Sequence, residues 1–453
     1  MSHPYSAGQQ SRRPPFDLAA GCATRAVVNA DTIFALSTGR PPAAVAIIRV
    51  SGPLAHAAAE VVAGDLPEAR YAAVRTLRTA DGALLDDALV LRFDAPASFT
   101  GEDCVEFQCH GGRAVVDALL SALAAIDGLR EAGPGEFTRR AFENGRIDLT
   151  EAEGLADLIE AETESQRKAA LAMAEGGLKR QVGSWQDRLL ALSARAEAAI
   201  DYAEEGDVGG DPMLAAECAA LASELGEWLA RPRVEPLKDG IRVVVAGPPN
   251  AGKSSLLNAI AGTERAIVTD VPGTTRDHID VPLSLSGIPI LLTDTAGMRE
   301  SDDVIEKIGV GRTRSLVEAA DIVLWLGDPL EAPAHPPVIR VHARCDLSNR
   351  KVVPDDSLPV SALTGAGLAV LLERLSRLAA TLLPAEGALA LNRRQAAILA
   401  EAHAALQHAG NTADIVLQAE HLRVSRETLH RLTGRAGVED MLDALFGRFC
   451  LGK

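Results

Sequence analysis

Short runs rich in β-branched and other apolar residues mark the first part of the chain, from about residue 30 to residue 130. The runs AAVAIIRVSGP (43–53), ALVLRF (88–93) and CVEFQC (104–109) have strand character, and the first stops at a Gly-Pro pair. Residues 112–128 place apolar side chains at helical spacing and end at a glycine. This pattern predicts an α+β domain.

From about residue 148 the strand pattern disappears, and the sequence is helical nearly throughout. An apolar seam recurs at spacings of four and three residues, at Leu178, Val182, Trp185, Leu189, Leu192 and Ala196. That spacing places the seam on one face of a long helix. Residues 390–453 are again helical with polar faces. We interpret the seam as packing within a helical bundle rather than as a ligand site.

Residues 240–383, between the two helical segments, alternate apolar strands with helices. The strand-like runs are IRVVVAG, IPILLTDT, DIVLWLG and PVIRVHA, and the proline-rich stretch 328–338 is expected to be a loop. Such alternation is typical of a parallel sheet covered by helices. The fold class is therefore multidomain α+β and α/β, with the α/β domain inserted into one discontinuous helical domain.

Composition and charge exclude some classes of protein. The formal net charge is −17, so bulk attraction to nucleic acid is not expected, and an RNA contact would need a local basic patch. The six cysteines show no CxxC spacing, which indicates neither a zinc site nor a disulfide framework and suits a reducing compartment. No stretch of about 18 uncharged apolar residues exists, so we expect no membrane span and a cytoplasmic protein.

The stretch GPPNAGKSS (247–255) carries the strongest chemical signal, because it matches GxxxxGK[ST] between an apolar strand and a helix. Gly247 and Gly252 let backbone N–H groups face phosphate oxygens. Lys253 adds a positive charge over the β- and γ-phosphates, and Ser254 offers a hydroxyl ligand for Mg²⁺. The sequence therefore predicts a nucleotide-binding P-loop.

Two further motifs follow the P-loop in the order of a GTPase. DTAG (294–297) ends a strand, where Asp294 would hold the Mg²⁺ shell through water and the Gly297 amide would sense the γ-phosphate. PGTTRD (272–277) lies between the P-loop and DTAG, where a switch threonine completes the Mg²⁺ shell. Together they predict a GTPase switch architecture.

The guanine-reading motif departs from the usual Asn-Lys-x-Asp. Here ARCD (343–346) follows the strand, so Asp346 is placed to accept from the base while Ala343 cannot replace the asparagine. The backbone of 361–363 supplies a second contact to the base. We expect GTP specificity with weaker guanine affinity, by on the order of 1–2 kcal/mol for the lost hydrogen bonds.

Catalysis departs from the Ras pattern as well. The position of the water-orienting glutamine after DxxG holds Met298, which cannot orient water. Acidic residues in RESDDVIEK (299–307) offer alternatives. Asn250 inside the P-loop could ligate a monovalent cation beside the phosphates and replace the charge of an arginine finger.

The chain as a whole resembles the MnmE (TrmE) family of tRNA-modifying GTPases, over about residues 30–453. The resemblance rests on these motifs: DTIFAL, IIRVSG, SFTGEDCVEFQCHGG, PGEFTRRAFENGRIDLTEAEGLADLIEA, GPPNAGKSSLLN, TDVPGTTRD, DTAGMRE and the terminal FCLGK. It implies a homodimer that forms a heterotetramer with MnmG (GidA), a partner that uses FAD and NADH. Together they would install a (carboxymethyl)aminomethyl-type group at C5 of the wobble uridine of certain tRNAs, with a one-carbon unit from 5-formyl- or methylene-tetrahydrofolate.

The resemblance also implies roles for residues of the GTPase site. Asn250, Thr269, Val271 and Thr274 would bind K⁺, and Ser254 and Thr275 would bind Mg²⁺. Glu306 would orient the attacking water, and Arg299 would belong to the second switch. The full set expected at GTP is Asn250, Ala251, Gly252, Lys253, Ser254, Ser255, Thr269, Asp270, Val271, Pro272, Gly273, Thr274, Thr275, Asp294, Thr295, Ala296, Gly297, Asp346, Ser361, Ala362 and Leu363.

A folate site is implied outside the GTPase domain, at Arg49, Glu106, Arg146 and Lys453. A carboxylate such as Glu106 can accept from the pterin edge, and cations can meet the folate's glutamate tail or formyl oxygen. Cys450 is a candidate catalytic thiol in the terminal FCLGK, either as a nucleophile or as a spacer. Gly452 would let this terminal arm pass closely by a ligand.

These inferences divide the chain into five segments. Residues 1–29 are expected to be a disordered extension, and residues 30–146 an α+β tetrahydrofolate-binding and dimerisation domain. The helical domain comprises 147–238 and 384–453, and the G domain, 239–383, lies between its two parts.

Two other functions stay open. One is a ribosome-assembly or signalling GTPase that acts as an RNA- or protein-binding switch. The other is a folate-dependent transferase with a vestigial G domain.

Overall fold

The structure is a computed structural model that describes residues 31–202, 212–263, 265–266, 280–294, 315–334, 336–385, 387–435, 439–447, 449 and 452. The chain forms two compact units. The first ends at Arg146 and also takes in Gly452 near the end of the chain, and the second begins at Ile147. Each unit is described by itself.

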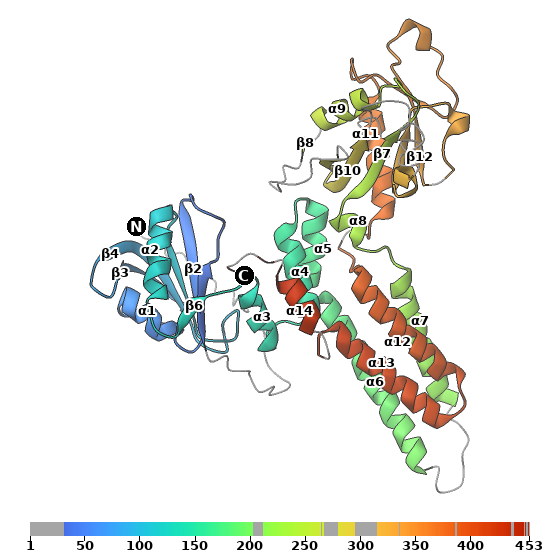
Figure 1. Ribbon diagram of the computed structural model, residues 1–453. Coiled ribbons are helices and arrows are strands. Elements are labelled where there is room, and N and C mark those ends of the chain that lie inside the picture. The colour runs from blue at the N-terminus through green and yellow to red at the C-terminus, as the bar shows by residue number, and fades with distance from the viewer. Residues whose placement is uncertain are drawn as a thin grey trace, which may run out of the picture. The chain divides into compact units, whose positions relative to one another are not determined.

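The first unit is built on a six-stranded sheet of order β3-β4-β5-β2-β1-β6. Its strands are β1 (Thr32–Leu36), β2 (Val45–Ser51), β3 (Ala72–Arg78), β4 (Leu84–Phe93), β5 (Cys104–His110) and β6 (Leu129–Glu131). Neighbouring strands are antiparallel except β1 and β6, which are parallel. Helices α1 (Ala55–Ala63) and α2 (Arg113–Ala124) pack their apolar faces on one side of the sheet (Figure 1). The expected α+β domain is confirmed.

The pattern overlooked five elements of this unit: the strands β1, β3 and β6, the helix α1 and the short helix α3 (Glu136–Glu143). Strand β3 is an edge strand whose residues are mostly exposed, so its sequence carries little apolar signal. Helix α3 begins after Gly135, which has a positive φ, and is rich in charge. It buries the charged Arg140 together with Phe137 and Ala141.

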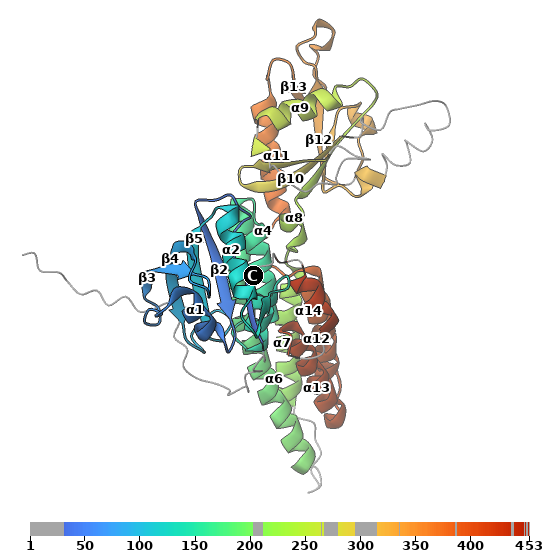
Figure 2. The ribbon, with the colours of Figure 1, turned by 60° about the vertical axis from the view of Figure 1, so that its left-hand side comes forward.

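The second unit contains the helical domain, whose helices come from both sides of the G domain. These are α4 (Leu149–Glu160), α5 (Glu164–Ala174), α6 (Gly177–Tyr202), α7 (Pro212–Ala230), α12 (Arg393–Asn411), α13 (Ile415–Leu432) and α14 (Glu439–Phe446). All six residues of the predicted seam on α6 are buried, in one core with residues of α7, α12 and α13. Trp185 packs edge-to-face on Trp228 of α7. Figure 2 shows α6, α7, α12 and α13 side by side, which confirms the discontinuous helical domain.

The G domain is a seven-stranded sheet, as far as the described residues show, of order β13-β12-β11-β7-β10-β9-β8. Its strands are β7 (Ile241–Ala246), β8 (Arg265–Ala266), β9 (Asp280–Leu285), β10 (Ile288–Asp294), β11 (Ile322–Trp325), β12 (Val338–Ala343) and β13 (Leu358–Val360). From β13 to β10 the strands are parallel. Val243 and Val245 of β7 face one core while Val244 and Ala246 face the other, so the strand is buried on both sides. The predicted inserted α/β domain is confirmed.

Helices α9 (Lys253–Thr263) and α11 (Leu368–Leu382) also belong to the G domain, and the short α8 (Glu235–Lys238), which precedes β7, packs its Leu237 in the same core. None of the helices in the described residues is both long and apolar enough to span a membrane.

Candidate nucleotide and folate sites

The P-loop joins the end of β7 at Ala246 to the start of α9 at Lys253, and its backbone has an unusual course. Gly247, Asn250 and Gly252 all have positive φ values, of 144°, 59° and 100°. A Cβ atom on Gly247 would lie 3.1 Å from backbone atoms of Leu326 and Gly327. Because a side chain here would be both strained and crowded, the glycine allows the loop to curl at the end of the strand.

Three of the predicted phosphate and Mg²⁺ residues, Lys253, Ser254 and Asp294, lie together at this end of the sheet. The Nζ of Lys253, which is 8% exposed, donates to the carbonyl oxygens of Gly247 and Pro248 at 2.9 Å each. The Ser254 hydroxyl donates to Oδ2 of Asp294 at 2.6 Å. Asp294 is the last residue of β10 and pairs in register with Val245 of β7, so parallel pairing brings this aspartate beside the P-loop. A hydroxyl and a carboxylate oxygen are ligands that suit Mg²⁺.

The base-reading segment follows β12 and lies beside β13. Ala343 ends β12, is buried, and pairs in register with Val360, the last residue of β13. The next residue, Arg344, extends its Nε to within 3.3 Å of where a Cβ on Gly252 would lie, so its side chain reaches the P-loop. Arg344 therefore links the base-reading segment to the P-loop.

The remaining base-site residues differ in exposure. Asp346 is exposed, as expected of a group that must meet a ligand. Ser361 is buried, its amide donates to the Ala366 carbonyl oxygen, and its Oγ accepts from the Thr364 amide. Leu363 is largely exposed. The structure thus holds the 361–363 backbone in a tight turn beside ARCD.

In the first unit, the structure brings Arg49 and Glu106 together across neighbouring strands. They are register partners on β2 and β5, and the Nε and Nη2 of Arg49 lie 2.9 Å and 2.7 Å from Oε1 of Glu106. The rings of Phe99 and Phe137 have their centroids 5.5 Å and 5.6 Å from the guanidinium carbon of Arg49. The guanidinium is thereby fixed in position by a carboxylate and two aromatic rings.

Arg146 is connected to the Arg49–Glu106 pair by the turn that contains Phe99. A Cβ on Gly101 would lie 3.1 Å from Cγ and 3.2 Å from Cδ of Arg146, so the arginine stem packs on this glycine. Phe99 and Gly101 are two residues apart in one turn, and this turn connects Arg146 with the Arg49–Glu106 pair. Phe99 was missed by sequence reasoning, although a phenylalanine two residues before a glycine, between two predicted strands, was a usable signal.

A buried cluster of charged residues includes Glu102, which follows Gly101 of this turn, and so helps hold the turn in place. Arg140, only 2% exposed, donates from Nη2 to Asp31 Oδ1 at 2.9 Å and from Nη1 to Glu102 Oε2 at 3.2 Å. Glu102 Oε2 also accepts from the Ser51 hydroxyl at 2.8 Å. Burial raises the pKa of Glu136, but hydrogen bonds from Arg130, the Gly133 amide and Arg140 outweigh it and hold that pKa below its ordinary value. Sequence patterns gave no sign of this cluster.

Gly452, near the end of the chain, lies against β1 within the first unit. A Cβ on Gly452 would lie 1.9 Å from the Leu36 carbonyl oxygen and 2.4 Å from Cα of Ser37. Only glycine fits such a close approach. Leu36 and Ala35 pair in register with Ile48 and Arg49, so this contact is made close to the strand pair that carries Arg49.

Several predicted site residues lie outside the described residues. They are Thr269, Asp270, Val271, Pro272, Gly273, Thr274, Thr275, Thr295, Ala296, Gly297, Arg299, Glu306, Cys450 and Lys453. Their roles stay predictions.

Comparisons with known proteins match both units. Residues 32–146 match the family model of the GTP-binding protein TrmE N-terminus, and residues 149–450 match that of the MnmE helical domain. The tRNA modification GTPase MnmE of Erythrobacter litoralis is 52% identical over 425 residues, which cover 93% of this chain and 100% of the relative. The protein of the same name from Rhizorhabdus wittichii is 54% identical over 428 residues, covering 93% and 97%.

Among solved structures, the G domain of the T. maritima FeoB iron transporter is 26% identical to this chain. The match covers 31% of this chain and 98% of that one, with a TM-score of 0.23.

Proposed function

We propose that this chain, which belongs to the MnmE family of tRNA modification GTPases, uses GTP hydrolysis to drive the modification of wobble uridines at C5. Family membership makes it a GTP hydrolase with a role in tRNA modification. The finer proposal is that it works in the cytoplasm as a homodimer, in a heterotetramer with the FAD- and NADH-using protein MnmG. The product would carry a (carboxymethyl)aminomethyl-type group whose one-carbon unit comes from a tetrahydrofolate.

The observation that carries the GTPase part is the grouping of Lys253, Ser254 and Asp294. The lysine charge lies over the curled P-loop, and the hydroxyl and carboxylate are 2.6 Å apart where a nucleotide's Mg²⁺ would be bound. When bound, the ion would neutralise developing charge on the β- and γ-phosphates. Lys253 would hold the same phosphates, while Asp346 and the backbone of Ser361, Ala362 and Leu363 would orient guanine.

Hydrolysis in this proposal depends on a monovalent cation rather than on an arginine finger. Asn250 is exposed in the P-loop and has a positive φ, so its amide oxygen can face the phosphates. Thr269, the Val271 carbonyl and Thr274 would complete the K⁺ site, and Thr275 would join Ser254 at Mg²⁺. Glu306 would orient the attacking water, and Arg299 would move with the second switch.

The folate proposal rests on the Arg49–Glu106 pair. Arg49 fixes the carboxylate of Glu106 so that it can accept from the donors of a pterin edge, and Arg146 reaches the same turn. Lys453 would follow Gly452 toward this site, and Cys450 would act there as a nucleophile or a spacer. Residues 30–146 would thus bind folate and dimerise. Residues 147–238 with 384–453 would form the helical domain, and 239–383 the G domain.

The cation dependence of GTP turnover tests this function. We expect faster turnover in K⁺ than in Na⁺ at equal ionic strength, up to the roughly 10³–10⁵-fold that an arginine finger supplies. Asn250→Ala should abolish the difference, because it removes a ligand from the P-loop. The control is Asn411→Ala, an exposed amide at the end of α12. Equal rates in the two salts would contradict the mechanism.

A further inference from the structure

The connection between β4 and β5 turns polar residues inward and its one large apolar residue outward. Ser98 is 5% exposed and Thr100 is fully buried, whereas Phe99 between them is 37% exposed. Buried hydroxyl groups cost free energy unless they are hydrogen-bonded, and an exposed phenyl ring forgoes the free energy of its own burial. Because this order is the reverse of the one that stability favours, stability alone does not explain the exposed ring.

Hydrogen bonds hold both neighbours of this ring in place. Ser98 Oγ donates to the Glu102 carbonyl oxygen at 2.5 Å, and the hydroxyl oxygens of Thr100 and Ser51 lie 2.7 Å apart. The side-chain amide of Asn144 donates to the Thr100 carbonyl oxygen at 2.8 Å. The backbone on both sides of the ring is therefore fixed, and so is the direction in which the ring leaves the chain.

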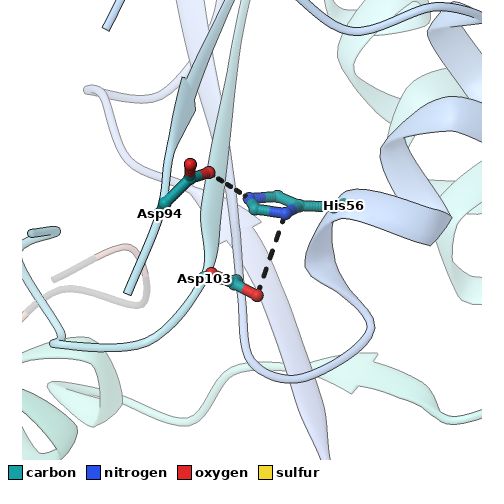
Figure 3. Close-up of side chains that lie close together, drawn as sticks. All are labelled: His56, Asp94 and Asp103. Atoms are coloured by element: carbon teal, nitrogen blue, oxygen red, sulfur yellow. Dashed lines mark ion pairs between the residues drawn. The ribbon is translucent and has the colours of Figure 1, made fainter. Parts of the chain in front are cut away.

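The two ends of the connection are held against α1. Figure 3 shows the imidazole of His56 beside the carboxylates of Asp94 and Asp103, which follow β4 and precede β5. Asp94 Oδ1 lies 3.6 Å from Nε2, and Asp103 Oδ2 lies 3.8 Å from Nδ1. The Phe93 carbonyl oxygen is also within hydrogen-bond distance of Nε2, at 3.2 Å. These contacts brace the ends of the connection, and Phe99 has a fixed place in the unit.

That place is beside the Arg49–Glu106 pair. The ring centroid of Phe99 is 5.5 Å from the guanidinium carbon of Arg49, and the centroid of Phe137 is 5.6 Å from the same carbon. Phe137 is fully buried, and Glu106 accepts from the guanidinium at 2.7 Å and 2.9 Å. The buried ring and the carboxylate already support Arg49, so the exposed part of Phe99 is left to meet a ligand at this site.

We propose that Phe99 packs against the planar face of the pterin while Glu106 accepts hydrogen bonds from the pterin's N–H edge. This inference rests on the proposed folate function and adds the residue that selects for a flat heterocycle. A pterin has donors at its edge and a polarisable apolar face, so a complementary site needs both a carboxylate and a ring. Nucleobases, which have the same kind of face, gain affinity by stacking on aromatic side chains.

Isothermal calorimetry on the full-length chain, with 5-formyl-tetrahydrofolate and probes for its two halves, tests this role. Phe99→Ala should weaken binding of 5-formyl-tetrahydrofolate by about 5–150-fold, as the loss of base–aromatic stacking does. It should weaken binding of 6-methyltetrahydropterin by a similar factor and leave that of p-aminobenzoylglutamate unchanged. Phe99→Tyr should bind all three as the wild type does, because it keeps the ring.

A double-mutant cycle separates contact with the ligand from support of Arg49. The loss caused by Phe99→Ala should persist when Arg49 is also replaced by alanine, because the ring meets the pterin directly. If the loss disappears in the Arg49→Ala background, Phe99 acts only through Arg49 and the proposal fails.

Tyr71→Ala is the matched control, because it removes an exposed aromatic ring that precedes β3. Its folate affinity should equal that of the wild type. Equal folate affinities of Phe99→Ala and the wild type would overturn the proposal. A wild-type chain that binds no folate would instead contradict the proposed folate function, so the two failures are distinguishable.

Discussion

At the scale of single residues, the Arg49–Glu106 ion pair has the most direct consequence for ligand binding. Arg49→Ala should weaken 5-formyl-tetrahydrofolate binding by roughly 10–150-fold, the loss of one charged hydrogen bond of about 1.5–3 kcal/mol. GTP turnover should not change, because the pair lies outside the G domain. Calorimetry on the full chain measures the affinity. Arg78→Ala, an exposed arginine on β3, is the control, and an Arg49→Ala variant that binds folate normally would refute the assignment.

Asp346 is the second residue with a specific expected effect. Asp346→Asn replaces the acceptor of guanine's N1–H and amino protons with an amide that can donate to a C2 carbonyl. The variant should therefore prefer XTP to GTP, reversing the wild type. Turnover measured with both nucleotides checks this. Unchanged preference would show that another group reads the base in this chain.

Single residues were predictable where the chemistry is contained in a short stretch of sequence. Lys253 and Ser254 follow from one motif, and the structure places Ser254 against Asp294. The buried cluster of Arg140, Asp31 and Glu102 could not be predicted. Arg140 lies on α3, while Asp31 and Glu102 precede β1 and β5, and their meeting depends on the fold alone.

At the scale of elements, α3 is held to the sheet by charge rather than by apolar contacts alone. Its Glu136 accepts from Arg130 and Arg140, which hold the pKa of this carboxyl below its ordinary 4.5. A lowered carboxyl pKa stabilises the folded state above the ordinary pKa, and this stabilisation is lost as pH falls through the lowered value. The first unit should therefore lose stability below about pH 4.5.

Glu136→Gln tests this dependence. The variant should lose about 1.5–3 kcal/mol at pH 7, and its stability should fall less than that of the wild type on acidification. Urea unfolding followed by hydrogen exchange of residues 31–146 gives both values. The control on the same helix is Glu143→Gln, whose pair with Arg139 is more exposed and should contribute less than about 1 kcal/mol. Parallel pH curves for Glu136→Gln and wild type would contradict the account.

Elements were predictable in proportion to their burial. Strand β7 and the seam of α6 have strong apolar patterns because they are buried, on both faces and along one face respectively. Strand β3 at the sheet edge and the charged α3 have weak patterns and were overlooked. Ion pairs between residues that are far apart in the sequence help to hold α3 on the sheet. The periodicity of apolar residues gives no information about such pairs.

At the scale of the whole molecule, the change of pattern near residues 148, 240 and 390 predicted the inserted G domain. The packing of α12 and α13 with α6 and α7 in one core confirmed it. The close contact of Gly452 with Leu36 could not be predicted from the sequence, because the residues of FCLGK do not indicate which part of the chain they contact. This contact places the end of the chain in the same unit as Arg49.

The central claim is that this chain modifies the wobble uridine of tRNA in a GTP-dependent way. The most direct test is mass spectrometry of wobble uridines in tRNA from a strain that lacks this protein. We predict that the C5 modification is missing, that the wild-type chain restores it, and that Lys253→Ala does not. Normal wobble uridine modification in the strain without the protein would contradict the account.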